Sequence, residues 1–155
     1  MALLGGCDLG AAGSQPSAGE ALERAARTAG LVSDPRQVTP VGMFSSESDR
    51  VCIAPLDGTR RRIGVSIDYG DGQRCLARGT VSGRTALRMK LGDGCSFTAR
   101  LDAERLRFPA VLPAACDRAC TGRASLGALT AGRLSDAPGE ALRARGADGA
   151  LLCAG

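Results

Sequence analysis

Five short runs of alternating apolar and polar residues follow one another between positions 62 and 108, and each run ends at a turn signal. In the first run, the apolar side chains fall on every second residue from Ile63 to Tyr69. A period of two places these side chains on one face of an extended strand. Including this first run, strands are therefore expected at residues 62–69, 73–82, 85–91, 95–101 and 105–108.

The turns between these runs carry the residues that tight hairpins require. Asp71-Gly72 and Asp93-Gly94 are dipeptides typical of turns in which both central residues have a positive φ angle. Asp102 to Glu104 supplies another turn. Pro109 and Pro113 end the regular pairing, because proline has no N–H to donate to a neighbouring strand. Consecutive strands joined by tight turns predict an antiparallel meander with one face in water.

The flanks of the meander add further elements. Strands are expected at residues 38–44 and 50–54, and the apolar stretch 124–134 is compatible with either a strand or a loop. A total of about seven or eight strands predicts a mainly β domain, in which the meander closes into a small barrel or folds into a sandwich. Two short helices are also predicted, one over residues 17–30 and one opening at Pro138 and stopped by Gly146. Ser17 and Glu20 fit a capping box at the start of the first helix.

The seven cysteines divide into one isolated residue and an even set. Cys7 stands alone near the N-terminus, and the other six are Cys52, Cys75, Cys95, Cys116, Cys120 and Cys153. An even set within a domain indicates disulfide bonds, which form in oxidising compartments. Many pairings are open, and Cys120–Cys153 is favoured because it would fix the C-terminal segment to the domain. The alternative is a cytosolic protein with reduced, buried cysteines.

The sequence Leu4-Gly5-Gly6-Cys7 resembles the lipobox of bacterial lipoproteins, at which signal peptidase II cleaves and the cysteine becomes a lipidated N-terminus. The resemblance implies a lipid on Cys7 and a place in the bacterial cell envelope, anchored to a membrane and facing the periplasm. A basic and an apolar region normally precede a lipobox. Residues 1–16 are therefore interpreted as a shortened signal with its lipobox, followed by a flexible tether. Residues 17–155 are interpreted as a single disulfide-stapled β-rich domain.

The order of anchor, tether, meander and late cysteines is broadly similar to that of small β-barrel lipoproteins that inhibit lysozyme. Those inhibitors carry a Ser-Gly-x-x-Tyr loop, of which Ser82-Gly83 matches only the first two residues. The similarity therefore concerns the layout, and inhibition of lysozyme is not inferred from it.

The 155 residues contain no histidine. This excludes Ser-His-Asp and Cys-His catalysis and metal sites that use imidazole, and no cofactor or metal is expected. Cys116 and Cys120 have the spacing of half an all-cysteine zinc site, which is kept as an alternative. The acidic stretch from Asp68 to Gly72 is interpreted as a turn, because Asp and Gly are favoured there for backbone reasons.

Basic residues are concentrated in the meander, where residues 60 to 107 hold eleven Lys and Arg against five Asp and Glu. The strand pattern places eight of them on polar faces: Arg62, Arg74, Arg78, Arg88, Lys90, Arg100, Arg105 and Arg107. A cationic sheet face would attract an anionic envelope component, such as lipid head groups or an acidic protein. The alternative is an ordinary solvated face. Nucleic acid is not expected, because the face lacks aromatic platforms apart from Tyr69.

The sequence therefore predicts a cell-envelope lipoprotein with a non-catalytic binding or inhibitor-like β-domain. Two other classes stay open. One is a structural envelope protein without a small ligand, and the other is a histidine-free enzyme that uses Asp or Cys.

Overall fold

The structure is a computed structural model that describes residues 16–29, 38–102 and 104–154. The chain divides into two compact units, residues 1–37 and residues 38–155. The first unit contains helix α1 (Ala18–Thr28). Its capping box is formed as predicted: the Ser17 N–H donates to Glu20 Oε2 at 2.8 Å, and the Glu20 N–H donates to Ser17 Oγ at 3.2 Å. Cys7, the predicted lipidation site, lies outside the described residues.

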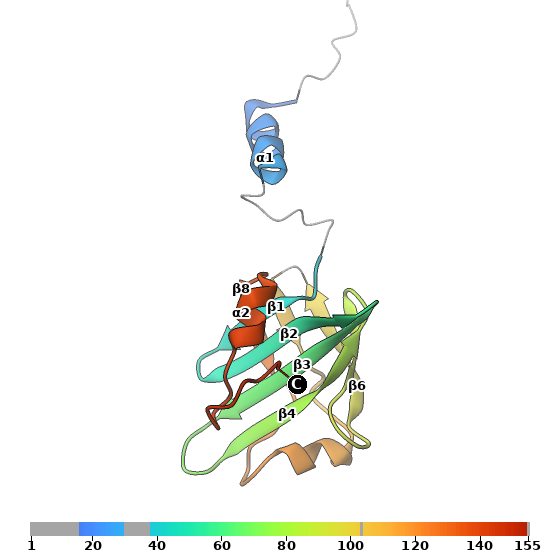
Figure 1. Cartoon of the computed structure of the whole chain (residues 1–155), viewed down its shortest axis with the longest axis vertical. Helices are drawn as coiled ribbons and strands as arrows, with labels where there is room; N and C mark the ends of the chain where they lie inside the picture. The colour runs from blue at the N-terminus through green and yellow to red at the C-terminus, as the bar shows by residue number, and fades with distance from the viewer. Residues whose placement is uncertain (1–15, 30–37, 103, 155) are drawn as a thin grey trace, which may run out of the picture. The chain divides into compact units, whose positions relative to one another are not determined.

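The second unit is a closed barrel of eight antiparallel strands, in which each strand pairs with its neighbours in sequence and β8 pairs with β1 (Figure 1). The strands are β1 (Gly42–Ser46), β2 (Asp49–Asp57), β3 (Arg60–Asp68), β4 (Arg74–Ser82), β5 (Ala86–Lys90), β6 (Ser96–Asp102), β7 (Arg105–Arg107) and β8 (Thr130–Ser135). The prediction of a mainly β meander is confirmed, and the meander forms a barrel rather than a sandwich. Closure of the barrel gives both terminal strands a pairing partner.

The strands β3 to β7 coincide closely with the five alternating runs of the sequence. In the β3–β4 hairpin, the Tyr69 N–H donates to the Gln73 carbonyl at 2.9 Å. Gly70, Asp71 and Gly72 have φ angles of 78°, 50° and 76° between them. The positive φ angles explain the Gly-Asp-Gly sequence and confirm that this acidic stretch is a turn. The β1 strand starts at Gly42, later than predicted, and only the second half of the stretch 124–134 enters β8.

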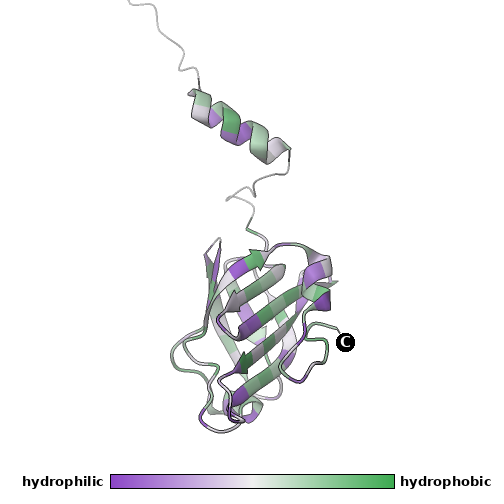
Figure 2. Ribbon diagram, turned by 90° about the vertical axis from the view of Figure 1, so that its left-hand side faces the viewer, coloured by the Kyte–Doolittle hydropathy of each residue, from purple (hydrophilic) through white to green (hydrophobic). Residues whose placement is uncertain are grey.

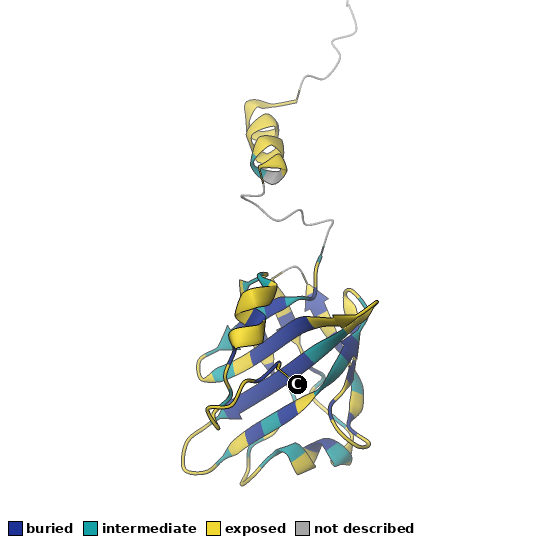
Figure 3. Cartoon of the chain, viewed as in Figure 1, coloured by how far each residue is buried: buried dark blue, intermediate teal, exposed yellow. Residues whose placement is uncertain are grey.

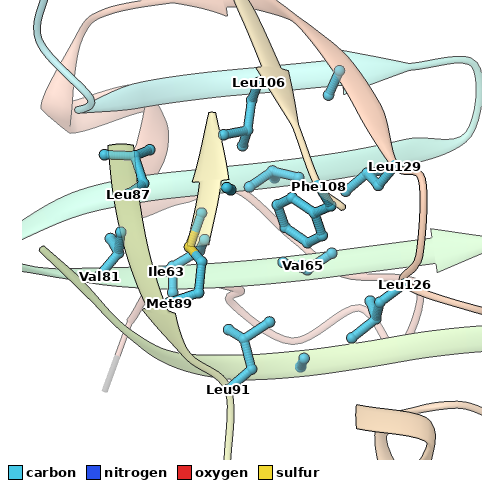
Figure 4. Packing of buried hydrophobic residues seen from close by; sticks show 14 of the residues in the cluster. Ile63, Val65, Val81, Leu87, Met89, Leu91, Leu106, Phe108, Leu126 and Leu129 are labelled. Atoms are coloured by element: carbon cyan, nitrogen blue, oxygen red, sulfur yellow. The ribbon is translucent and has the colours of Figure 1, made fainter. Parts of the chain in front are cut away.

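The interior of the barrel is filled by one cluster of apolar side chains (Figure 4). Labelled members of this cluster are Ile63, Val65, Val81, Leu87, Met89, Leu91, Leu106, Phe108, Leu126 and Leu129. Phe97 packs edge-on against Phe108, with 4.9 Å between the ring centroids. Hydrophobic and hydrophilic bands alternate along the strands, as the period of two requires (Figure 2).

The connection from β7 to β8 closes one end of the barrel. It contains a short 3₁₀ helix, η1 (Ala114–Ala119), and the buried side chains of Leu126 and Leu129. Two disulfides attach this connection to the start of β4 and to the residue before β6: Cys75–Cys120 and Cys95–Cys116. The seal at this end is therefore covalent as well as hydrophobic.

The opposite end of the barrel is occupied by Arg133, which points inward from β8. Its Nη2 donates to the Thr39 carbonyl at 2.7 Å, and its Nη1 donates to the Val41 carbonyl at 3.0 Å. The guanidinium also lies 4.7 Å from the ring centroid of Phe44. Burial lowers the pKa of Arg133, and the nearby carboxylate of Glu104 opposes that shift. This arginine holds the segment before β1 over the barrel mouth.

An outer layer covers part of the barrel wall. Helix α2 (Pro138–Arg143) and the C-terminal segment pack on β1, β2 and β3 and bury a second cluster: Cys52, Ala54, Ala141, Ala144, Leu152 and Cys153. The central parts of β2 and β3 are accordingly buried beneath the C-terminal segment (Figure 3). Ser66 is buried on this side, and its Oγ accepts a hydrogen bond from the Ala147 N–H at 2.9 Å. The outer face of β3 is therefore an internal surface of the protein.

Six cysteines form three disulfides, which confirms their predicted use, but the favoured pairing Cys120–Cys153 is wrong. Cys153 pairs with Cys52, and Cys120 pairs with Cys75. The reason is the path of the C-terminal segment, which runs over the outer face of β2 and β3 while Cys120 lies at the closed end of the barrel. A disulfide does fix the C-terminal segment, through a different partner.

Candidate anion-binding face

Five of the eight predicted basic residues project outward from three neighbouring strands. This set, called the basic face below, consists of Arg88, Lys90, Arg100, Arg105 and Arg107. All five side chains alternate with buried residues along β5, β6 and β7 and are exposed. Neighbouring strands lie about 5 Å apart, so the five cations share one small area of the wall.

The basic face contains few compensating acids. Asp102 lies 3.6 Å from Arg107 in an exposed ion pair. Within the described part of the chain, Arg88, Lys90, Arg100 and Arg105 make no side-chain hydrogen bond or ion pair. Exposed ion pairs contribute at most about 1 kcal/mol, so even Arg107 remains available to another anion.

The strand register places two of these cations directly opposite each other. Arg100 on β6 is directly opposite Arg107 on β7, and Arg88 on β5 is opposite Thr98, one position diagonal to Arg100. Like charges directly opposite each other destabilise a sheet. The ion pair of Arg107 with Asp102 offsets this repulsion in part, and Arg100 keeps its uncompensated charge within the described part of the chain.

The other three predicted basic residues lie elsewhere on the wall. Arg78 on β4 is engaged by the C-terminal segment, where its Nη2 lies 3.3 Å from both Asp148 Oδ2 and the Leu151 carbonyl oxygen. Arg62 on β3 is half-buried beside the same segment. Arg74 begins β4, opposite Asp68. Five of the eight predicted residues therefore lie together on the basic face, and the other three lie outside it.

The alternative metal sites are not formed in the described part of the chain. Cys116 and Cys120 are both in disulfides, so the proposed half-site for zinc is wrong. Asp68 uses Oδ1 to accept a hydrogen bond from the Gly70 N–H at 2.9 Å, which serves the turn. The described residues contain no group of three or more Cys, Asp or Glu side chains able to hold a metal ion.

A groove that sequence reasoning missed lies beside α2. It has a volume of about 690 Å³ and is lined by Met43, Arg50, Leu134, Glu140, Arg143, Ala144, Arg145 and Gly146. These residues come from β1, β2, β8, α2 and the segment after it. A sequence signal was present in Leu134, a leucine on the outward side of a strand, but the position of α2 could not be read from it.

Comparison of the chain with protein-family models, with curated proteins and with solved structures finds no match. Among the described residues, no helix combines the length and the apolar character needed to cross a membrane.

Proposed function

We propose that the protein is a bacterial cell-envelope lipoprotein whose barrel lies against an anionic membrane surface through the basic face. The observation that carries this proposal is the group of exposed cations on β5 to β7, four of which have no counter-ion in the described part of the chain. The three disulfides support an oxidising compartment such as the periplasm. The lipid on Cys7 is part of the proposal and comes from the resemblance of residues 4–7 to a lipobox.

The shape of the site favours a surface over a small ligand. The cations stand on the outer wall of a barrel whose interior is filled by apolar side chains. Between the cations lie shorter side chains, such as those of Thr98 and Ala86, and no apolar side chain of β5 to β7 is exposed beside them to line a pocket for a small ligand apart from Ala86. Each Lys or Arg near an anionic membrane surface contributes about 1 kcal/mol, so the five together would orient a barrel that a lipid already tethers.

Vesicle binding tests the basic face. The full chain with Cys7→Ser, which cannot be acylated on that residue, is mixed with vesicles of phosphatidylcholine alone or with added phosphatidylglycerol. We expect sedimentation only with the anionic vesicles, and a loss of affinity of about 30-fold when Arg88→Gln and Arg100→Gln are combined. Added salt should weaken binding further, because exposed charges are screened.

A matched pair of substitutions controls for net charge. Arg24→Gln with Arg123→Gln removes the same charge from exposed positions outside the basic face. Equal losses in both double variants would show a general charge effect and would contradict the proposed face. No binding to anionic vesicles, together with capture of an acidic envelope protein, would favour a protein partner instead.

The anchor is tested by the intact mass of the protein purified from its own host. A species that begins at Cys7 and carries acyl groups is expected. A species that begins at Met1 or Ala2 without acyl groups would refute the lipoprotein assignment.

A further inference from the structure

The groove beside α2 has the composition of a site for an amphipathic anion. Its floor is apolar, formed by Met43 on β1, Leu134 on β8 and Ala144 after α2. Leu134 is 65% exposed although it stands in a strand, where solvent-facing positions of this barrel are mostly polar. The volume of about 690 Å³ falls within the range of small-molecule sites.

Three arginines surround this floor. Arg50 comes from β2, Arg143 from the last turn of α2, and Arg145 from the segment that follows. Arg145 donates from Nη1 to the Gly149 carbonyl at 2.7 Å, which fixes its position. Arg50 and Arg143 make no side-chain hydrogen bond or ion pair within the described residues. Among the described residues, Glu140 is the one acidic residue in the lining, so the three arginines leave the described lining with a positive charge.

We propose that this groove binds an acyl chain that ends in an anionic group, a carboxylate or a phosphate. The chain lies along Leu134, Met43 and Ala144, and the anionic group is held between Arg50 and Arg143. The arginines favour a negatively charged head group, and the exposed side chain of Leu134 favours an apolar chain attached to it. Two guanidiniums converging on one oxyanion supply charge-assisted hydrogen bonds, which are stronger than those between neutral groups.

The groove uses residues that the basic face does not use. The two sites adjoin along the wall, because β8, which carries Leu134, pairs with β7, where Arg105 is opposite Gly132. The two arginines proposed to hold the anion come from β2 and α2, whereas Arg88 and Arg100 come from β5 and β6, and β2 stands four strands from β6. Failure of one proposal does not imply failure of the other.

Calorimetry with soluble amphiphiles below their micelle concentration tests the groove. The probes are laurate and dodecyl phosphate, with dodecyltrimethylammonium as the cation of the same chain length and inorganic phosphate as the head group alone. We expect laurate and dodecyl phosphate to bind one per chain. The cation and inorganic phosphate should bind at least 100-fold more weakly.

Variants locate the binding on the protein. Arg50→Gln combined with Arg143→Gln should weaken laurate binding at least 10-fold, and Leu134→Ser should weaken it by a similar factor. Arg88→Gln with Arg100→Gln, on the basic face, should leave laurate binding unchanged. Near-ultraviolet circular dichroism shows whether each variant keeps its fold, and all five substitutions are at exposed positions.

Three results would overturn the proposal. One is the absence of laurate binding at millimolar concentration, and another is binding that survives the loss of both arginines. The third is self-association of the wild-type chain that Leu134→Ser abolishes, because a second copy would then cover the groove.

Discussion

Replacing Gly64 by alanine tests the contact between the C-terminal segment and β3. Both the sign and the size of the change in unfolding free energy are informative. Gly64 faces outward from β3 directly beneath Leu152. A Cβ atom added to Gly64 would lie 2.8 Å from the carbonyl carbon of Leu152 and closer still to its oxygen. Leu152 cannot easily move, because its N–H donates to the Ala144 carbonyl at 2.7 Å and Cys153 is bonded to Cys52.

Gly132 provides a matched control. It also faces outward from a strand, and an added Cβ would meet only the Ser45 carbonyl oxygen, at 3.8 Å. Alanine in a strand is more favourable than glycine by about 0.5–1 kcal/mol, because glycine loses more conformational freedom on folding. Gly132→Ala should therefore be neutral or slightly stabilising.

Gly64→Ala also reduces the conformational freedom lost on folding, but it adds the steric cost of the clash between the new Cβ atom and Leu152. Overpacking a well-packed site costs about 1–3 kcal/mol, and the rigid backbone of Leu152 places this site near the upper end. The net loss of unfolding free energy should be about 2 kcal/mol. Urea unfolding of both variants without reductant measures the difference. Equal midpoints for Gly64→Ala and Gly132→Ala would refute the close packing of the C-terminal segment on β3.

Three further predictions concern stability. Arg133→Met should lower the free energy of unfolding by about 2 kcal/mol in urea, because the Thr39 and Val41 carbonyls lose a charged donor whose own side chain is largely buried, whereas the exposed Arg100→Met should change it by less than about 0.5 kcal/mol. Replacing both cysteines of Cys52–Cys153 by alanine should lower the free energy of unfolding by about 4 kcal/mol, and the same change at either inner disulfide should lower it by about 3.5 kcal/mol. The three bonds join residues 101, 45 and 21 positions apart, and the inner bonds shorten the loop that the outer bond closes. Losses near zero for all three variants in guanidinium unfolding would contradict the pairing. Burial, followed by repulsion from Glu47, raises the pKa of Asp49, whose Oδ1 is buried without a hydrogen-bond donor among the described residues. A raised pKa in the folded state favours folding at low pH and disfavours it as pH rises through that pKa, so Asp49→Asn should raise the melting temperature at pH 7 and not at pH 3.

The barrel strands that the sequence predicts well are those with one wet and one buried face. From Leu87 to Leu91, alternation follows directly from this asymmetry. In β3 the alternation of Ile63, Val65 and Ile67 survives although the outer face is also buried, because the covered outer positions are the small residues Gly64 and Ser66. In β2 the run from Val51 to Ala54 is buried on both faces, because the C-terminal segment covers the outside, so the strand shows no alternation. Periodicity alone could not set the limits of that strand.

The last strand was ambiguous for a different reason. In β8 the charged residue Arg133 points into the barrel, and the apolar residue Leu134 points out. This inverts the usual relation between polarity and face, so the sequence of 124–134 is compatible with either a strand or a loop and does not decide between them. The groove depends on that inversion and on the position of α2, and neither can be inferred from local sequence. The basic face was predicted in part, because strand alternation places its side chains but does not show that the C-terminal segment engages Arg78.

The three disulfides are concentric along the chain: Cys95–Cys116 lies inside Cys75–Cys120, which lies inside Cys52–Cys153. A chain emerges N-terminus first, so an oxidase that joins cysteines in order of emergence would produce Cys52–Cys75, Cys95–Cys116 and Cys120–Cys153. One of these bonds is native, and the other two rearrange into the native pairs only with a thiolate from outside the chain. That thiolate opens Cys52–Cys75 and stays on Cys52, the freed Cys75 attacks Cys120–Cys153 at Cys120, and the released Cys153 then displaces the outside thiol from Cys52. Recovery of correctly linked barrel should therefore depend on a disulfide isomerase or a redox buffer rather than on an oxidant alone.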